Sequence, residues 1–129
     1  PRGVEARHVA NVSEQLGDPR DWGERGERLV DTGHAHADGD PVRILVRKRG
    51  RRYDLDDRGE AVAKARALGA PTGWLENPER LVAEEGFNVN RRGVVFVSAV
   101  EGRDLASLAQ RLGACAYVVH AELVGSTVS

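Results

Sequence analysis

The sequence contains one cysteine and no run of about 18 apolar residues, and these two absences exclude several classes of protein. A single cysteine, Cys115, cannot form an internal disulfide, and its apolar neighbours in LGACAYVV are expected to raise the pKa of its thiol rather than activate it. The lack of a long apolar run excludes a membrane span. The opening PRGVEARHVA lacks the apolar centre of a secretory signal, so we expect a cytoplasmic protein.

The motifs of several common enzyme and nucleotide-binding classes are missing as well. No glycine motif of the Walker or dinucleotide type is present, and no Ser, His and Asp occur at a recognisable catalytic spacing. The acidic stretch DLDDRGE lacks the ligand spacing of a calcium loop, and helix capping accounts for its Asp57 and for Glu60. Motifs therefore assign no enzyme class to this chain.

Charge of one sign is not in excess, because 19 basic residues stand against 20 acidic ones and the formal net charge is −1. This balance argues against a protein whose whole surface holds nucleic acid or an anionic membrane. A chain of 129 residues with 40% hydrophobic content is the size of one ordinary domain with one modest core. Any site for a polyanion must therefore be local.

The first third of the chain shows helical patterning followed by a polar stretch. Apolar residues recur at helical spacing over residues 4–17, and Asp18 followed by Pro19 has the features of a second helix start. Residues 32–41, TGHAHADGDP, are small and polar and are predicted to be a flexible loop. We predict that residues 1–40 form a helical arm with this loop. Such an arm has few apolar anchors, so packing of its helices against a second copy would give a homodimer.

Residues 41–129 show the period of β-strands followed by that of helices. Alternating apolar residues on both sides of Gly50 predict a β-hairpin. The capping signals that follow predict one helix over residues 57–69 and a shorter one over residues 77–86. These segments are the start of an α+β core.

A second hairpin is predicted around Gly93. The apolar residues 94–100 that leave its turn are typical of a strand at the centre of a sheet, covered on both faces. Residues 105–112 are predicted to be helical. The helical pattern extends through residues 114–124, whereas AYVVHA also favours a strand there, and we prefer the helix.

Together these elements predict an α+β fold with an antiparallel sheet of about four strands, formed by two β-hairpins packed against helices. The segments 46–69 and 89–113 also share an order of strand, basic turn, strand and helix, which suggests a ββα duplication. Four pairs of residues keep the same separation of 43 positions: Gly50 and Gly93, Tyr53 and Phe96, Gly59 and Gly102, and Val62 and Leu105. The competing explanation is that any two hairpin–helix units share turn glycines and apolar positions.

Arginines gather at the two predicted turns. In a duplicated fold the two turns could form one cationic edge that binds a small anion or nucleic acid, because a guanidinium matches phosphate and carboxylate groups. The alternative is that these arginines keep exposed turns solvated and prevent sheet edges from pairing with other chains. The candidate anion-binding residues are Arg49, Arg51, Arg52, Arg91 and Arg92.

The basic hairpin RKRGRRYD ahead of a helix is also similar to the wing of winged-helix DNA-binding domains. In that family the tip of the wing contacts the phosphate backbone, which implies a DNA-binding protein. The similarity covers about a dozen residues, and no convincing recognition helix precedes the hairpin.

The stretch TGHAHADGD contains the most reactive-looking group of side chains. His34, His36 and Asp38 are ligand types suited to zinc or another divalent metal. The string His-x-His-x-Asp resembles part of the metal signature of metallo-β-lactamase-like hydrolases. Here Gly39 stands where that signature has a further histidine, and the chain is too short for the two-layered fold of that family. Alternating polar residues in a loop are more often solvated than bound to metal.

These observations favour a non-enzymatic binding or regulatory module with an arginine edge. Two alternatives remain open: a metal-dependent enzyme that uses His34, His36 and Asp38, and a winged-helix-type DNA-binding protein. The binding module and the winged-helix protein both depend on the arginine turns. The metal-dependent enzyme depends on the loop at residues 32–41, here called the histidine loop.

Overall fold

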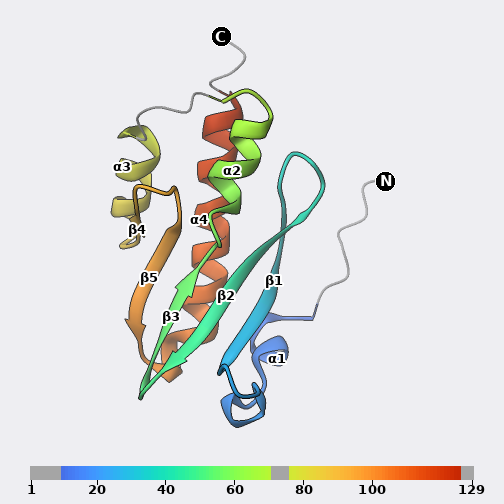
Figure 1. Cartoon of the computed structure of the whole chain (residues 1–129), viewed down its shortest axis with the longest axis vertical. Coiled ribbons are helices and arrows are strands. Elements are labelled where there is room, and N and C mark those ends of the chain that lie inside the picture. The colour runs from blue at the N-terminus through green and yellow to red at the C-terminus, as the bar shows by residue number, and fades with distance from the viewer. Residues whose placement is uncertain (1–9, 71–75, 126–129) are drawn as a thin grey trace.

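The computed structural model describes residues 10–70 and 76–125 of the protein. An antiparallel sheet of five strands carries helices on one face (Figure 1). Its spatial order is β1-β2-β3-β5-β4, and every neighbouring pair is antiparallel. The strands are β1 (Glu27–Ala35), β2 (Pro41–Arg49), β3 (Arg52–Asp56), β4 (Asn88–Val89) and β5 (Val95–Val100).

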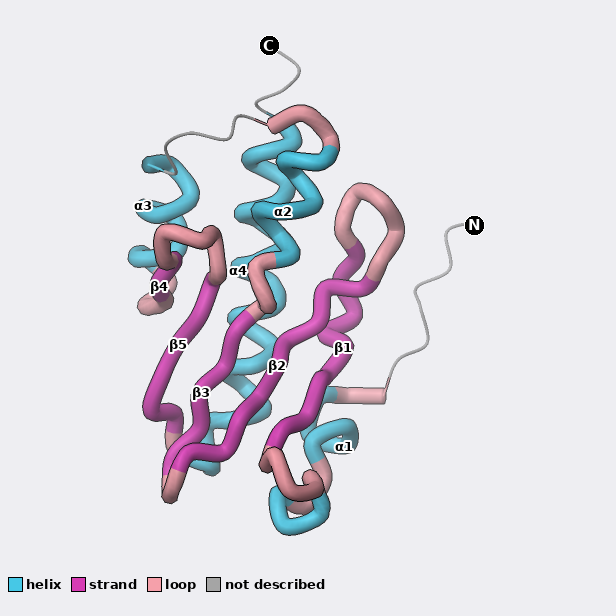
Figure 2. The backbone as a smooth tube through the Cα atoms, in the orientation of Figure 1, coloured by secondary structure: helices cyan, strands magenta, loops and turns pink. Residues whose placement is uncertain are grey.

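Helix α4 runs along the sheet, and the other helices are arranged around it (Figure 2). Helix α1 contacts β1 and α4, α2 packs on α4, and α3 lies against α4 and β4. None of the described helices combines the length and the apolar content that a membrane crossing requires. The helices are α1 (Val12–Leu16), α2 (Glu60–Ala67), α3 (Glu76–Glu84) and α4 (Leu105–Gly125), with short 3-10 helices at Pro19–Asp21 and Gly102–Asp104.

The core lies between α4 and the helix-facing side of the sheet. Alternate residues of β2 point into it, and Val42, Ile44 and Val46 are completely buried. Leu112 and Val119 of α4 meet them from the other layer and are equally buried. Each such side chain contributes about 1.5–3 kcal/mol by leaving water, so this two-layer contact is the main source of stability.

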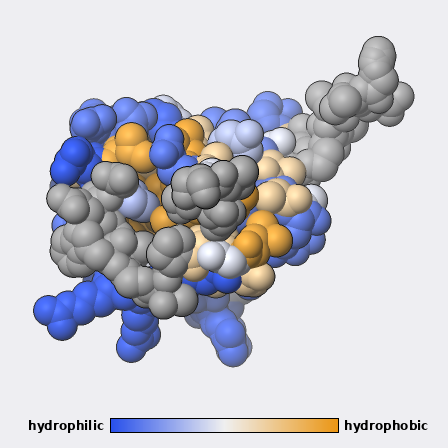
Figure 3. Space-filling view, turned by 90° about the horizontal axis from the view of Figure 1, so that it is seen from above, coloured by the Kyte–Doolittle hydropathy of each residue, from blue (hydrophilic) through white to orange (hydrophobic). Residues whose placement is uncertain are grey.

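The opposite face of the sheet carries charged side chains beside a few apolar ones, such as the paired residues Leu29 and Leu45. Arg47 of β2 forms ion pairs with Glu27 of β1 at 3.0 Å, and Arg49 pairs with Asp54 of β3 at 3.2 Å. Seen from above, long hydrophilic side chains project from one side of the molecule, whereas apolar atoms reach the surface among the helices (Figure 3). An antiparallel sheet with one packed and one solvated face accounts for the alternating pattern of β2.

The predicted α+β class with an antiparallel sheet on helices is confirmed, but the sheet gains a strand that the sequence did not indicate. The start signal at Asp18 produces only the 3-10 turn Pro19–Asp21, and the prediction of a longer helix there is wrong. Residues 27–35 form β1 instead, because Val30 and Thr32 face the core and Val30 pairs with Ile44 of β2. The predicted loop at 32–41 thus contains the end of β1 and the turn of the β1–β2 hairpin.

The N-terminal segment is part of the core rather than a loosely attached arm. Val12, Leu16 and Trp22 are all buried, and the Trp22 indole N–H donates to the Leu16 carbonyl at 2.6 Å. The Trp22 ring also packs edge-on against Tyr53 of β3, with 5.8 Å between ring centroids. Because this segment already buries its apolar residues in its own chain, the reason for expecting a homodimer through these helices is removed. Residues 4–9 of the first predicted helix lie outside the described residues.

Two predictions for the second half of the chain have different outcomes. Residues 114–124 are helical, since α4 continues without a break from Leu105 to Gly125. Strand β5 is not central, because it lies next to the edge strand β4, and its Ser98 and Ala99 are exposed. Strand β3 occupies the middle of the sheet.

A buried carboxylate joins β3, α2 and β5. Asp57 is 1% exposed, and its Oδ1 accepts the Gly59 N–H at 2.8 Å and the Val95 N–H at 3.0 Å, while Oδ2 accepts the Ala61 N–H at 3.1 Å. Burial raises its pKa to about 6, and the three backbone hydrogen bonds act in the opposite direction. As predicted, Asp57 accepts an N–H of the first turn of α2, but the residue at the N-cap position is Gly59. The predicted capping box is wrong, because the Glu60 carboxylate pairs with Arg58 at 3.5 Å.

Helix α4 approaches β1 closely at Gly113. A Cβ at Gly113 would lie 2.7 Å from both Cβ and Oγ1 of Thr32, closer than real Cβ atoms come to any neighbour. The Thr32 hydroxyl is fixed because it donates to the Val42 carbonyl at 2.7 Å. Glycine inside a helix costs about 1 kcal/mol relative to alanine, and here it permits the helix and the strand to touch.

We predict that Gly113→Ala lowers the free energy of unfolding by about 1–3 kcal/mol, because the new methyl group overpacks the contact with Thr32. The matched control is Gly125→Ala at the end of the same helix, where an added Cβ meets nothing within 4 Å. It should leave stability unchanged or slightly increased. Urea unfolding of both variants measures the difference, and equal stabilities would contradict the close approach.

We predict that Asp57→Asn destabilises the protein by about 1–3 kcal/mol, because an amide group offers one acceptor oxygen and turns its NH₂ toward a backbone N–H. Asp57→Ala should cost more, since it leaves three N–H groups without this acceptor. The control is Asp56→Asn, because the Asp56 carboxylate accepts the Arg58 N–H at a partly exposed position. Thermal unfolding separates the cases, and an Asp57→Asn variant as stable as the control would refute the role.

Candidate functional site

The two arginine turns lie at opposite ends of the sheet. Near the β2–β3 turn, Tyr53 pairs with Val100 at the end of β5, whereas Asp56 pairs with Phe96 near the β4–β5 turn. The length of β3 therefore separates the two turns, which is roughly 15 Å at 3.3 Å per residue. Figure 1 shows the β2–β3 turn at the lower end of the sheet and the β4–β5 turn at the upper end. The predicted shared cationic edge is wrong.

The same pairing explains why the proposed duplication could not have produced such an edge. In both units the second strand leads from the turn toward a helix, and these second strands, β3 and β5, are neighbours. They run antiparallel, so a duplication that joins the units through them must direct the two turns in opposite directions. The topology agrees with a ββα duplication but not with the surface inferred from it.

Part of the arginine charge is also paired locally. At the β2–β3 turn, Arg49 forms an ion pair with Asp54. Arg52 lies 3.7 Å from the Glu101 carboxylate and 3.4 Å from the Ala99 carbonyl. Arg51, Arg91 and Arg92 are exposed. In the described chain, only the short α1 and a 3-10 turn precede this hairpin among helical elements, and neither is long enough to act as a recognition helix.

The three predicted metal ligands contact three different groups. The His34 ring stacks on Tyr117 of α4 at 5.3 Å between centroids, His36 packs against His120, and Asp38 pairs with Lys64. Over residues 10–70 and 76–125, the structure contains no group of three or more His, Cys, Asp or Glu side chains placed to hold a metal ion. The structure thus does not bring His34, His36 and Asp38 together as a ligand set.

His36 belongs to a buried pair of histidines that the sequence did not reveal. Its ring lies 4.6 Å from that of His120, and the two side chains are 4% and 2% exposed. The His120 Nε2 accepts the Ala37 N–H at 3.0 Å, so its Nδ1 carries the proton and donates to the Ala61 carbonyl at 3.0 Å. Both nitrogens of His120 are therefore occupied in joining the β1–β2 loop to α2. The only sequence signal was the helical spacing that places His120 on the inner side of α4.

The loop is also held by an ion pair with two acidic partners. The Lys64 ammonium on α2 lies 2.6 Å from Asp38 and 2.6 Å from Asp40. Its hydrogen bonds with these carboxylates raise the pKa of Lys64, and the bond from Lys64 lowers the pKa of Asp38. The histidine loop is therefore held to α2 by charge and to α4 by the His120 ring.

Burial lowers the pKa of His36 to about 4, and the proximity of His120 and Lys64 acts in the same direction. Its Nδ1 is buried and has no hydrogen-bond partner within the described chain. A neutral imidazole tolerates this position, whereas an imidazolium would be left without an acceptor. The cluster therefore stabilises the loop at neutral pH and does not present a general base to a substrate.

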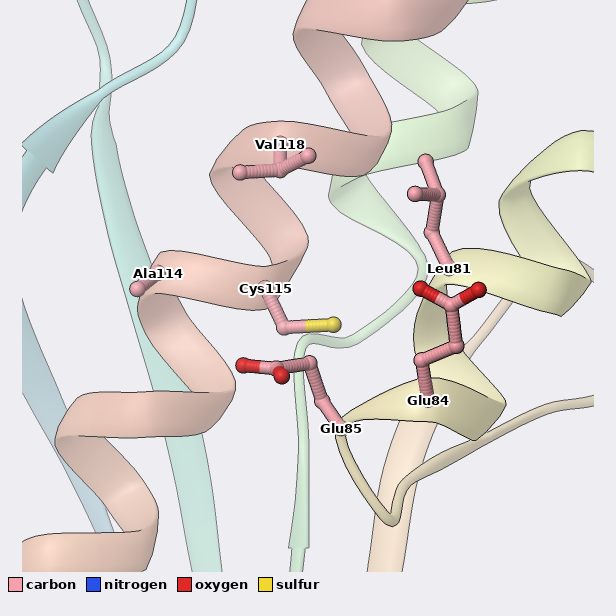
Figure 4. A pocket seen from close by; sticks show the side chains of 6 residues that line it. All are labelled: Leu81, Glu84, Glu85, Ala114, Cys115 and Val118. Atoms are coloured by element: carbon pink, nitrogen blue, oxygen red, sulfur yellow. The ribbon is translucent and has the colours of Figure 1, made fainter.

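A second candidate site is a pocket of about 220 Å³ between α3 and α4. Figure 4 shows Leu81 and the carboxylates of Glu84 and Glu85 on one side, facing α4. The residues supplied by α4 are Ala114, Cys115 and Val118.

The cysteine of this pocket is not poised as a nucleophile. Burial raises the pKa of Cys115 to about 11, and the nearby Glu85 carboxylate acts in the same direction. At neutral pH the group is therefore a thiol, which is a small apolar surface rather than an attacking thiolate. The prediction of a raised thiol pKa is confirmed, and the pocket is suited to binding rather than to covalent chemistry.

The end of α3 is fixed against α4 beside this pocket. The Arg111 guanidinium of α4 donates to the Glu85 carbonyl at 3.1 Å and lies 5.5 Å from the centre of the Phe87 ring. Phe87 is buried, so this contact connects the segment after α3 to the core. The two walls of the pocket are thus held in place without a ligand.

We predict that His36 contributes a loss of stability as the pH falls from about 6.5 to about 4, whereas protonation of Asp57, whose pKa is raised, acts in the opposite direction. The folded state depresses the pKa of this histidine below its unfolded value of about 6.5, so its neutral form stabilises the fold above that pH and protonation opposes folding below it. His36→Phe removes the titrating group and keeps a ring against His120. Urea unfolding at a series of pH values should give a shallower acid slope for the variant, by up to about 1.4 kcal/mol per pH unit. Identical slopes would contradict the buried neutral histidine.

Comparison with known proteins gives no relative from which a function could be transferred. No protein-family model, no curated protein and no solved structure matches the chain. The functional conclusion therefore rests on the geometry and chemistry of the described residues.

Proposed function

We propose that the protein is a non-enzymatic binding module and that the pocket between α3 and α4 receives an apolar group. The observation that carries this proposal is the open apolar pocket between Leu81 and Val118, where Val118 is 43% exposed. Exposed apolar surface that lines a concavity is a typical feature of a binding site.

The polar clusters of the described chain support the same conclusion, because their side chains form hydrogen bonds and ion pairs with other parts of the protein. Asp57 accepts three backbone N–H groups, both nitrogens of His120 have partners, and Lys64 bridges two carboxylates. An acid–base or nucleophilic catalyst must instead direct a reactive group toward a substrate. These clusters hold elements together, so they favour a structural role over a catalytic one.

The size of the pocket limits what it can hold. Its volume of about 220 Å³ is smaller than the roughly 300–1,000 Å³ typical of pockets for drug-sized ligands. It therefore suits a single group of the size of an amino-acid side chain. On the α4 side, here called the floor, the pocket is lined by the small residues Ala114 and Cys115, and Leu81 and Val118 provide apolar walls.

We predict that isoamyl alcohol, a neutral mimic of a leucine side chain, binds in this pocket with a dissociation constant on the order of millimolar. Titration of isotope-labelled protein should shift the amide NMR signals of Leu81, Cys115 and Val118 in a saturable way.

The variant Ala114→Leu fills the pocket from its floor and should abolish these shifts. The control is Leu68→Ser, which changes a 49% exposed apolar residue that does not line the pocket and should leave binding intact. Thermal unfolding verifies that both variants are folded. Absence of saturation in the wild type, or unchanged binding in Ala114→Leu, would refute the proposal.

A further inference from the structure

We infer that the occupant of the α3–α4 pocket is a segment of a partner protein that presents one aliphatic side chain beside a lysine or arginine. This inference rests on the proposed binding function and adds the chemistry of the partner. It follows from the charges at the rim of the pocket, from the volume of the pocket and from the exposed surface at its mouth.

The rim of the pocket is acidic. Glu84 and Glu85 are both exposed lining residues, and neither carboxylate forms an ion pair with another described residue. In Figure 4 the Glu84 carboxylate lies beside the space between Leu81 and Cys115, and the Glu85 carboxylate lies on the other side of Cys115. Two adjacent negative charges repel an anionic ligand and attract a cation, so the rim selects for positive charge.

Arg111, a cation that contacts the Glu85 backbone, does not neutralise this rim as an ion pair. Arg111 directs its guanidinium to the Glu85 carbonyl oxygen and to the Phe87 ring rather than to either carboxylate. It thereby anchors the end of α3, and the carboxylates remain available to a partner. A cationic group from outside can therefore approach Glu84 and Glu85 without displacing an internal ion pair.

The floor requires an apolar group next to that cation. Ala114, Cys115 and Val118 offer no charged atom at the pH of the cell, because the pKa of Cys115 is about 11. A lone ammonium placed there would lose its hydration without an acceptor. The ligand must therefore place carbon in the pocket and its charge at the rim.

A protein segment meets these requirements better than a free amine. A molecule small enough to enter about 220 Å³ makes few contacts, and affinity is limited by the number of its heavy atoms. The exposed Val118 extends the apolar surface to the mouth of the pocket, where a longer chain can add contacts. An anchored side chain with flanking charges is a common mode of peptide recognition.

The test compares three capped heptapeptides that differ only at the anchor and its neighbours. The first has a central leucine flanked by two lysines, the second has the same leucine flanked by two glutamates, and the third has a central serine flanked by two lysines. Amide NMR titration of the full chain gives their affinities, together with those of isoamyl alcohol and isoamylamine. The lysine–leucine peptide should bind about tenfold more tightly than the glutamate–leucine peptide and should lose this advantage at high salt.

Two variants test whether Glu84 and Glu85 cause the preference for the lysine–leucine peptide. The double variant Glu84→Gln with Glu85→Gln should bring the ratio between the two leucine peptides close to one. Glu79→Gln, an exposed position on the same helix that does not line the pocket, should keep the tenfold ratio.

The outcomes distinguish this inference from the proposed function. If isoamyl alcohol saturates the pocket but the lysine and glutamate peptides bind equally, the inferred partner chemistry is refuted and the binding module stands. If the serine peptide binds as well as the leucine peptide, the apolar anchor is refuted. If isoamylamine binds as tightly as the lysine–leucine peptide, the site takes small organic cations and a partner segment is refuted. Failure of isoamyl alcohol itself refutes the proposed function.

Discussion

The fold depends on the carboxylate of Asp57, which lies where three elements meet. Strand β3 ends at Asp56, α2 begins at Glu60 and β5 begins at Val95. The backbone of Asp57 continues the sheet by donating to the Val95 carbonyl at 3.0 Å, and its side chain accepts the N–H of the same residue. The carboxylate also accepts the Ala61 N–H in the first turn of α2. One side chain therefore fixes both the direction of α2 and the register of β5.

This geometry requires an unusual backbone. Arg58 and Gly59 both adopt left-handed conformations, with φ of 62° and 73°, so that the chain reverses and the Gly59 N–H points back to the carboxylate. A non-glycine residue in this conformation costs about 1 kcal/mol or more. Burial of the carboxylate adds a further cost, visible in the raised pKa of Asp57. The three hydrogen bonds offset both, since hydrogen bonds to a charged acceptor are the stronger ones.

The position of α2 then determines the state of the histidine loop. With α2 in place, the Ala61 carbonyl accepts a hydrogen bond from the His120 ring, and Lys64 reaches both Asp38 and Asp40. The side chains that looked most reactive in the sequence are thus used to close the β1–β2 hairpin. A short run of histidines and aspartates specifies ligand types, but only the tertiary structure decides which partners they face. The metal hypothesis was reasonable on composition, and the structure gives each residue a different partner.

Most features that depend on interactions between residues close in the sequence were predicted correctly, whereas several that depend on long-range contacts were not. Capping by Asp57 and the long α4 depend on neighbours within a few residues, and both were predictable. Strand β1 was missed because only Val30 and Thr32 of its interior residues are buried, and a register irregularity between Asp31 and Ala35 interrupts the alternation. The start signal at Asp18 was genuine but local, since its carboxylate accepts the Arg20 N–H and is satisfied by a single 3-10 turn. The spacing of a repeat likewise does not show how its two units are oriented in space. Here the antiparallel pairing of β3 with β5 places the two turns at opposite ends of the sheet.

The pocket was beyond sequence analysis because its walls come from residues 81–85 and 114–118, which only tertiary packing brings together. Its existence depends on small residues. Ala114 and Cys115 line the pocket from α4, and a larger side chain at Cys115, which points toward α3 in Figure 4, would fill the space between the helices. Closely packed proteins leave few such gaps, because atoms lining a gap lose dispersion contacts with neighbours. A fitting side chain from outside would restore dispersion contacts to the atoms that line this apolar gap. This gain in packing, more than any reactive group, is the reason to propose binding at this part of the molecule.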